Sequence, residues 1–117
     1  MTPEGRVKAK VKAVLARYAG NGLYVDWPVP SGYGTTTLDA IGWYRGQPFA
    51  IETKAPGKKP TLRQVEIGNR MAQAGAKLFI IDGVNGALEM MVEWLEHASG
   101  KAYDPYLPPD PVRRRTL

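Results

Sequence analysis

The segment from residue 37 to 54, TLDAIGWYRGQPFAIETK, constrains the fold of this chain more than any other part of it. Two short apolar runs with strand-like alternation meet at Arg45-Gly46, and this pattern predicts a β-hairpin. If those two residues form the whole loop, counting outward along both strands places Asp39 opposite Glu52. A three-residue loop is the competing prediction, and it would place the two carboxylates diagonally. The carboxylates stay close in either register.

A pair of carboxylates facing each other on a hairpin calls for a chemical reason. Residues two apart along a strand share a face, so Asp39, Glu52 and Lys54 are all predicted to project from the same side. Like charges directly opposite each other weaken a sheet, and a divalent cation between them would remove that penalty. Glu52 and Lys54 alone are more typical of a solvated strand face. The paired Asp39 is what favours a metal site.

The rest of the chain predicts helices and strands on both sides of the hairpin. Thr2-Pro3-Glu4 is typical of a helix start, and Thr61 to Gln64 has a capping-box pattern. Apolar spacing predicts helices over about 3–18, 61–74 and 87–98, and further strands over 23–29 and 76–81. The order α-β-β-β-α-β-α predicts an α/β fold, with a central mixed β-sheet flanked by helices.

Composition narrows the class of protein. The 117 residues suit one domain, predicted over 1–100 and followed by a Pro-rich, basic tail over 101–117. The absence of cysteine excludes disulfides and thiolate metal sites, and one histidine argues against a histidine-based zinc site. No apolar run approaches the roughly 20 residues that cross a membrane, and the N-terminus lacks a signal peptide. A cytoplasmic protein that is not secreted and has no membrane partner is therefore expected.

Positive charge gathers in separate parts of the chain, and the net charge is +5. Residues 1–20 carry five basic residues against Glu4, residues 54–63 carry four with no acid, and the tail ends in Arg113-Arg114-Arg115. Such clusters favour a nucleic-acid partner, although a solvated basic surface is the simpler alternative. The candidate DNA-contacting residues are Lys8, Lys12, Lys58, Lys59, Arg63 and Tyr33. Tyr33 is included because it can stack on bases from a Gly-rich loop, whereas packing is the favoured interpretation for Trp27 and Trp43.

The hairpin residues suit the hydrolysis of a phosphodiester. A hard cation such as Mg²⁺ needs one or two carboxylates plus substrate phosphate, and it helps to generate the nucleophile. Asp39 and Glu52 supply the carboxylates, and the backbone carbonyl of Thr53 is a candidate third ligand. Lys54 is predicted to orient or deprotonate the attacking water and to offset charge in the transition state.

Asp39 followed by Glu52-Thr53-Lys54 on adjoining strands resembles the PD-(D/E)xK nuclease superfamily. Three further features restrict the resemblance to one group within this superfamily. They are the basic loop after Lys54, the helix start at Thr61, and Gly75-Ala76 before an apolar strand. Over roughly residues 1–82 the chain is similar to the VRR-NUC (virus-type replication-repair nuclease) group.

Two positions depart from that group's pattern. Its usual Pro before the aspartate is Leu38 here, and its aliphatic residue between the glutamate and the lysine is Thr53. Neither change removes a functional group, so they bear on loop shape and leave the chemistry intact.

The resemblance implies a restriction-endonuclease-like core, with residues 1–100 as a single nuclease domain. It implies that Asp39, Glu52 and Lys54 are catalytic and that Mg²⁺ is the cofactor, with Mn²⁺ able to substitute. Gln64 would be an auxiliary catalytic residue, although capping Thr61 is an alternative role that can hold together with it. The site residues implied by the resemblance also include Glu4, as an acid that completes the metal site.

The expected activity is a metal-dependent DNA endonuclease that selects branched or junction DNA in replication, recombination or repair, with a phage as one candidate source. A homodimer is expected because two symmetric cuts need two sites, and because Met90 and Trp94 lie outside the predicted apolar face of the last helix. The alternative is a catalytically silent nucleic-acid-binding module with the same fold. The intact set of Asp39, Glu52 and Lys54 favours the nuclease.

Overall fold

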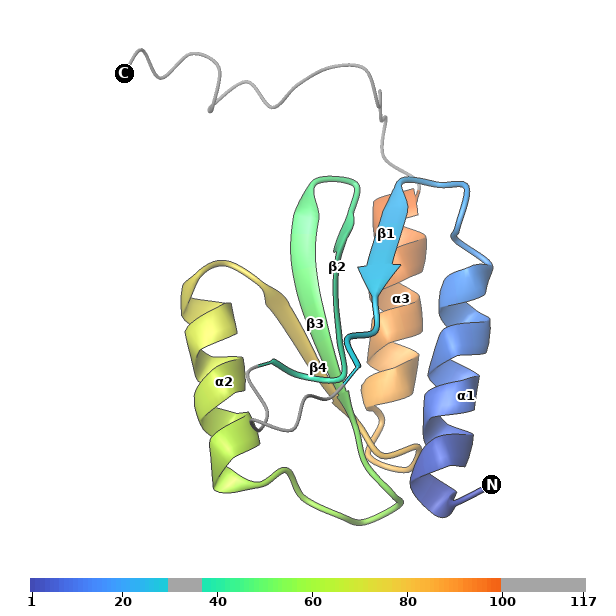
Figure 1. The fold of residues 1–117 in the computed structure, drawn as a ribbon. Helices are drawn as coiled ribbons and strands as arrows, with labels where there is room; N and C mark the ends of the chain where they lie inside the picture. The colour runs from blue at the N-terminus through green and yellow to red at the C-terminus, as the bar shows by residue number, and fades with distance from the viewer. Residues whose placement is uncertain (30–36, 100–117) are drawn as a thin grey trace.

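The structure, a computed structural model, describes residues 1–29 and 37–99 (Figure 1). The predicted order of helices and strands is confirmed, whereas Tyr33 and the tail over 101–117 lie outside the described residues. No helix within the described ranges is long and apolar enough to cross a bilayer. The elements are α1 (Pro3–Ala16), β1 (Leu23–Asp26), β2 (Ala40–Tyr44), β3 (Gln47–Thr53), α2 (Leu62–Gln73), β4 (Lys77–Ile81) and α3 (Ala87–Ser99).

The strands form a four-stranded mixed sheet in the order β1-β2-β3-β4. β2 pairs antiparallel with both β1 and β3, while β3 and β4 are parallel and are joined through α2. The predicted mixed sheet flanked by helices is therefore confirmed. β1 ends at Asp26, earlier than the predicted residue 29, because Pro28 has no N–H with which to continue the ladder.

The register of the hairpin follows the two-residue loop. Tyr44 pairs with Gln47, and the ladder continues to Ala40 opposite Ile51. Asp39 and Glu52 come one position beyond this pair on the two strands, as the two-residue loop predicts.

The turn at the tip of the hairpin explains this register. Arg45 has φ 52° and Gly46 has φ 88°, and two successive left-handed residues are the signature of a type I′ turn. Arginine is disfavoured at positive φ. Its guanidinium offsets this cost by donating to the Asn21 side-chain oxygen at 3.2 Å and to the Asn21 carbonyl at 3.4 Å. The three-residue loop is thereby excluded.

Both predicted helix starts are confirmed by their caps. The Thr2 hydroxyl accepts a hydrogen bond from the Gly5 N–H at 2.9 Å. The Thr61 hydroxyl accepts from the Gln64 N–H at 3.2 Å, and the Gln64 Oε1 accepts from the Thr61 N–H at 2.9 Å. This reciprocal pair is the capping box read from the sequence.

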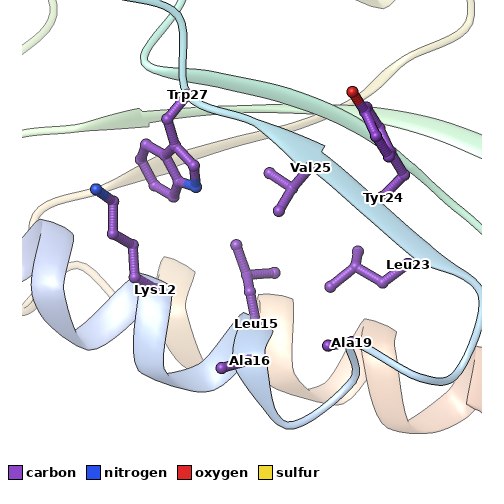
Figure 2. A pocket seen from close by; sticks show the side chains of 8 residues that line it. All are labelled: Lys12, Leu15, Ala16, Ala19, Leu23, Tyr24, Val25 and Trp27. Carbon is purple, nitrogen blue, oxygen red and sulfur yellow. The ribbon is translucent and has the colours of Figure 1, made fainter.

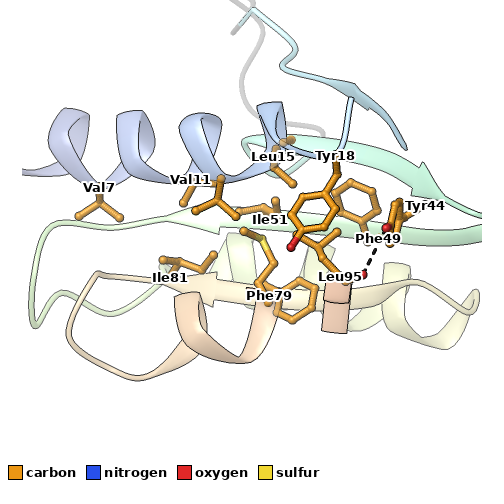
Figure 3. Close-up of a cluster of buried hydrophobic side chains, with 13 residues drawn as sticks. Val7, Val11, Leu15, Tyr18, Tyr44, Phe49, Ile51, Phe79, Ile81 and Leu95 are labelled. Carbon is orange, nitrogen blue, oxygen red and sulfur yellow. Dashed lines mark hydrogen bonds between the residues drawn. The ribbon is translucent and has the colours of Figure 1, made fainter. Parts of the chain in front are cut away.

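The sheet is covered on both faces, by α1 and α3 on one side and by α2 on the other (Figure 1). The larger core lies under α1 and α3, and the side chains that fill it are drawn in Figure 3. Its fully buried members include Val11, Tyr44, Phe49, Ile51, Ile81, Met91 and Leu95. The smaller core lies under α2 and contains Leu38, Ala50 and Ile67.

The position of Trp94 differs from the prediction. Its ring contacts Tyr44, Phe49 and Phe79, with centroid separations of 5.6, 5.6 and 5.5 Å. Trp94 therefore belongs to the core face of α3, and placing it outside that face was wrong. The long indole side chain reaches around the helix to the sheet, which spacing along the helix alone does not reveal. Met90 is 62% exposed, as predicted.

Candidate active site

The predicted catalytic side chains meet at the end of the sheet where β3 stops. Figure 1 shows that α1 and α2 both begin at this end of the molecule. Glu52 is the second-last residue of β3, and Lys54 directly follows this strand. Asp39 directly precedes β2. Gln64 reaches the same place from the first turn of α2. Elements distant in the chain thus converge on one small site.

Glu52 is at the centre of this arrangement and is only 3% exposed. The Asp39 N–H donates to its Oε1 at 3.2 Å, and the Gln64 Nε2 donates to its Oε2 at 2.9 Å. The Lys54 Nζ lies 4.0 Å from the Oε2. Burial, and then the charge of Asp39, raise the pKa of Glu52 to about 7, although Lys54 opposes the shift. The site therefore holds a carboxylate that gains stability from additional positive charge.

Gln64 uses both ends of its side-chain amide. Its oxygen caps α2 by accepting from the Thr61 N–H, and its nitrogen donates to Glu52. The capping role is confirmed, and the auxiliary catalytic role stays a prediction. Because one side chain makes both contacts, the start of α2 is fixed relative to the Glu52 carboxylate.

One oxygen of the Asp39 carboxylate is turned toward Thr53, while the carboxylate stays close enough for its charge to raise the pKa of Glu52. Its Oδ2 accepts from the Thr53 N–H at 2.9 Å and from the Thr53 hydroxyl at 2.6 Å. Side chains alternate along a strand, so the Thr53 hydroxyl lies on the opposite face from Glu52. The predicted common face holds for Glu52 and Lys54, which lie 4.0 Å apart, whereas the hydrogen bonds that the Asp39 carboxylate accepts come from Thr53. Asp39 precedes the strand, and the alternation of β2 does not fix its direction.

Lys8 on α1 holds the other oxygen of Asp39. Its Nζ lies 3.9 Å from the Asp39 Oδ1, and the two side chains are 35% and 23% exposed. A partly exposed ion pair of this length is weak, so it orients the carboxylate without neutralising it strongly. The role of Lys8 in binding DNA stays a prediction, and its contact with a candidate catalytic acid was not foreseen.

The donor set at the end of β3 fits a hard divalent cation. The Asp39 and Glu52 carboxylates come from adjoining strands, and each carboxylate has about four lone-pair sites, so acceptor capacity remains beyond the hydrogen bonds described. Mg²⁺ typically takes one or two carboxylates and keeps water in its other positions. Among residues 1–29 and 37–99, no group of three acidic, histidine or cysteine side chains is close enough to hold a metal ion. The charge of Glu4 helps to raise the pKa of Glu52, so Glu4 lies within electrostatic range of the pair without completing such a group. Glu4 and the Thr53 carbonyl stay predicted ligands.

Four other predicted DNA-contacting residues, Lys12, Lys58, Lys59 and Arg63, lie on α1, on α2 and in the loop before α2. Lys58 and Lys59 are exposed in the loop between β3 and α2. Arg63 is exposed in the first turn of α2 and pairs with Glu66 at 3.8 Å. The Lys12 Nζ lies 4.8 Å from the centroid of the Trp27 ring. Their contacts with nucleic acid stay predictions.

Asp82 is a structural residue of the site that the sequence reading missed. It directly follows β4, is 6% exposed, and accepts from the Val84 and Asn85 N–H groups at 2.8 and 2.7 Å. Its second oxygen accepts from the Gly57 N–H at 3.1 Å. These backbone hydrogen bonds lower the pKa of Asp82. Asp82 thereby ties the basic loop after β3 to the loop after β4, and an aspartate after an apolar strand is a turn signal that could have indicated it.

Asp82→Asn is expected to lower the midpoint of thermal unfolding at pH 7 by roughly 5 °C, because an amide nitrogen would face the Gly57 N–H. A carboxylate whose pKa is lowered on folding stabilises the protein above its unfolded pKa and loses that contribution as the pH falls through the folded value. The gap between wild type and variant should therefore narrow below about pH 4. Thermal unfolding at pH 7 and at pH 3.5 or below, with the exposed Asp26→Asn as control, measures this. A constant gap would contradict it.

Comparison with known proteins supports the fold directly. No family model matches the sequence, and a search of curated proteins finds no match. Among solved structures, the chain is similar to one described as "VRR_NUC domain", with a TM-score of 0.58 and 24% identity. The similarity covers 83% of this chain and 98% of the other. The chain therefore has the fold of that domain, and the fold class predicted from the sequence is confirmed.

Proposed function

We propose that the protein is a nuclease of the VRR-NUC type that hydrolyses phosphodiester bonds in DNA, with Mg²⁺ as its cofactor and Mn²⁺ able to substitute. One observation carries the proposal: Asp39, Glu52, Lys54 and Gln64 meet at the end of β3. The similarity of the fold to a VRR_NUC domain supports it independently.

Each of these side chains has a role in the proposed reaction. Asp39 and Glu52 would hold the cation, which supplies Lewis-acid activation of the phosphate and of a water molecule. Lys54 offers a positive charge beside Glu52, where it can orient the water and stabilise negative charge in the transition state. Gln64 holds the Glu52 carboxylate, while Thr53 and Lys8 hold that of Asp39.

A cleavage assay tests the proposal. Supercoiled plasmid and a four-way junction are incubated with the protein and Mg²⁺, Mn²⁺ or a chelator. Cleavage with either metal, and none with the chelator, is expected. Binding of DNA without cleavage under every metal condition would favour the silent nucleic-acid-binding module. Cleavage that persists with the chelator would overturn the metal assignment.

Lys54→Ala is expected to reduce the cleavage rate by about 10²–10⁴-fold, the usual contribution of one positioned acid–base group. Mg²⁺ affinity measured by calorimetry should change little, because the carboxylates remain. Lys77→Ala is the matched control. Lys77 is the first residue of β4, which is parallel to β3, so it lies at the end of the sheet opposite to Lys54. An equal loss of Mg²⁺ affinity would show that Lys54 instead holds the carboxylates in place.

The finer part of the proposal is a homodimer that prefers branched over linear duplex DNA, in the cytoplasm of a bacterial or phage-infected cell. A two-fold dimer supplies two matched sites for symmetric cuts. On α3, Met90 is 62% exposed and lines a hollow of about 300 Å³ together with Glu93, Trp94 and His97. Light scattering and a panel of junction and linear substrates test this. A monomer at tens of micromolar, together with equal cleavage of both substrates, would overturn it.

A further inference from the structure

A groove of about 470 Å³ runs between α1 and the edge strand β1 (Figure 2). Leu15 of α1 and Leu23 and Val25 of β1 project into it and make it apolar. Trp27 and Lys12 lie together at one end of the groove, as Figure 2 shows. The groove therefore combines an apolar lining with a cationic, aromatic end.

That aromatic end adjoins the candidate active site. The Lys8 Nζ lies 6.0 Å from the centroid of the Trp27 ring and 3.9 Å from the Asp39 Oδ1. One ammonium group thus separates the indole from a candidate catalytic carboxylate. A ligand on the Trp27 ring would sit next to whatever occupies the site.

The charges around Trp27 favour a polyanionic ligand. Lys8 and Lys12 are four residues apart on α1 and direct both ammonium groups to one indole. Like charges at this spacing destabilise a helix by a few tenths of a kcal/mol. The ring partly offsets the cost through cation–π attraction, and a phosphate between the two ammonium groups would reverse it. The basic charge of α1 thus points to nucleic acid in the groove more than to a peptide.

We propose that Trp27 stacks on an unpaired nucleobase of the substrate strand beside the cleaved phosphate, while Lys8 and Lys12 contact its flanking phosphates. This subsite rests on the proposed nuclease function and defines its substrate further. A base within a duplex has both faces covered by its neighbours, so only an unpaired base can present a face to Trp27. Unpaired bases stack on aromatic side chains without regard to sequence. The subsite therefore selects strands with unpaired nucleotides, such as those at a branch or a frayed end.

The test measures binding in the presence of a chelator, so that cleavage plays no part. Fluorescence anisotropy compares a labelled single strand with a blunt duplex of the same sequence. Trp27→Leu keeps apolar packing and removes the aromatic face, and Trp27→Phe restores a smaller ring. Trp43→Leu is the matched control, because Trp43 is 50% exposed on β2 and contacts Tyr24.

Trp27→Leu should weaken single-strand binding by about tenfold, within the range of stacking on one base. Duplex binding should change by less than about twofold, and Trp27→Phe should recover most of the loss. A single abasic nucleotide in the strand should weaken its binding to the wild-type protein by about the same factor as Trp27→Leu weakens binding of the intact strand. The abasic nucleotide should not weaken binding to Trp27→Leu any further. Equal small effects of Trp27→Leu and Trp43→Leu, or no effect of any abasic position, would overturn the proposal.

Two outcomes separate this inference from the nuclease proposal. If Trp27→Leu fails to fold, the abasic strands on wild type and the Trp27→Phe variant still decide the question. Loss of binding at an abasic position without cleavage under any metal condition would support the subsite and overturn the nuclease. Metal-dependent cleavage that is indifferent to every abasic position would support the nuclease and overturn the subsite.

Discussion

Glu52→Gln is expected to reduce DNA cleavage by more than about 10³-fold while leaving the protein at least as stable as wild type above neutral pH. The substitution keeps the shape of the buried side chain and removes the negative charge that would hold the cation. Single-turnover cleavage with Mg²⁺ measures the first effect. Glu66→Gln is the matched control, because Glu66 is an exposed glutamate on α2.

The effect of Glu52 on stability should depend on pH in a defined direction. Its pKa rises from 4.5 to about 7 on folding, so the folded protein binds more protons than the unfolded chain between those values. Stability that depends on this proton is present below the unfolded pKa and is lost as the pH rises through about 7. Urea unfolding at pH 5 and pH 8.5 should show wild type losing stability relative to Glu52→Gln at the higher pH. Near-wild-type cleavage, or the opposite trend with pH, would contradict the role given to Glu52.

Asp39→Asn is expected to abolish cleavage to a similar extent while DNA binding stays equal or becomes tighter. The amide oxygen can still accept from the Thr53 N–H and hydroxyl, so the local geometry should persist. Loss of the charge removes repulsion of phosphate and releases Lys8 from its ion pair. Anisotropy with a chelator measures binding, and Asp26→Asn is the control. Weaker DNA binding, or retained Mg²⁺-dependent turnover, would show that Asp39 has a different role.

The parts of the fold that the sequence predicted are those fixed by neighbouring residues. The turn at Arg45-Gly46 decides between the two hairpin registers. The alternation of apolar and polar residues along the two strands then determines the remaining pairs. Caps are similarly local, because Thr61 and Gln64 satisfy each other within one helical turn. The meeting of Asp39 and Glu52 followed from this local order, since they lie on the two arms of one hairpin.

The features that were missed depend on contacts between distant parts of the chain. Asp82 accepts a hydrogen bond from Gly57, and Trp94 packs against rings from three strands. Whether Asp39 points toward α1 or α2 depends on the Thr53 hydroxyl and on Lys8, which no periodicity in the sequence connects. Partners of this kind become visible only when the elements are packed together.

The hairpin turn has a consequence for the kinds of mutation that the site can tolerate. Figure 1 shows the turn at the end of the sheet opposite to the start of α1 and α2, and so remote from the carboxylates. Replacing a residue there changes only how well the loop is formed. An insertion or deletion that the loop does not absorb would shift the pairing by a single position and turn the side chains of one arm to the other face. The length of the loop at this remote tip therefore bears on the site through the strand register, so a change of length there can disturb the carboxylates without touching either of them.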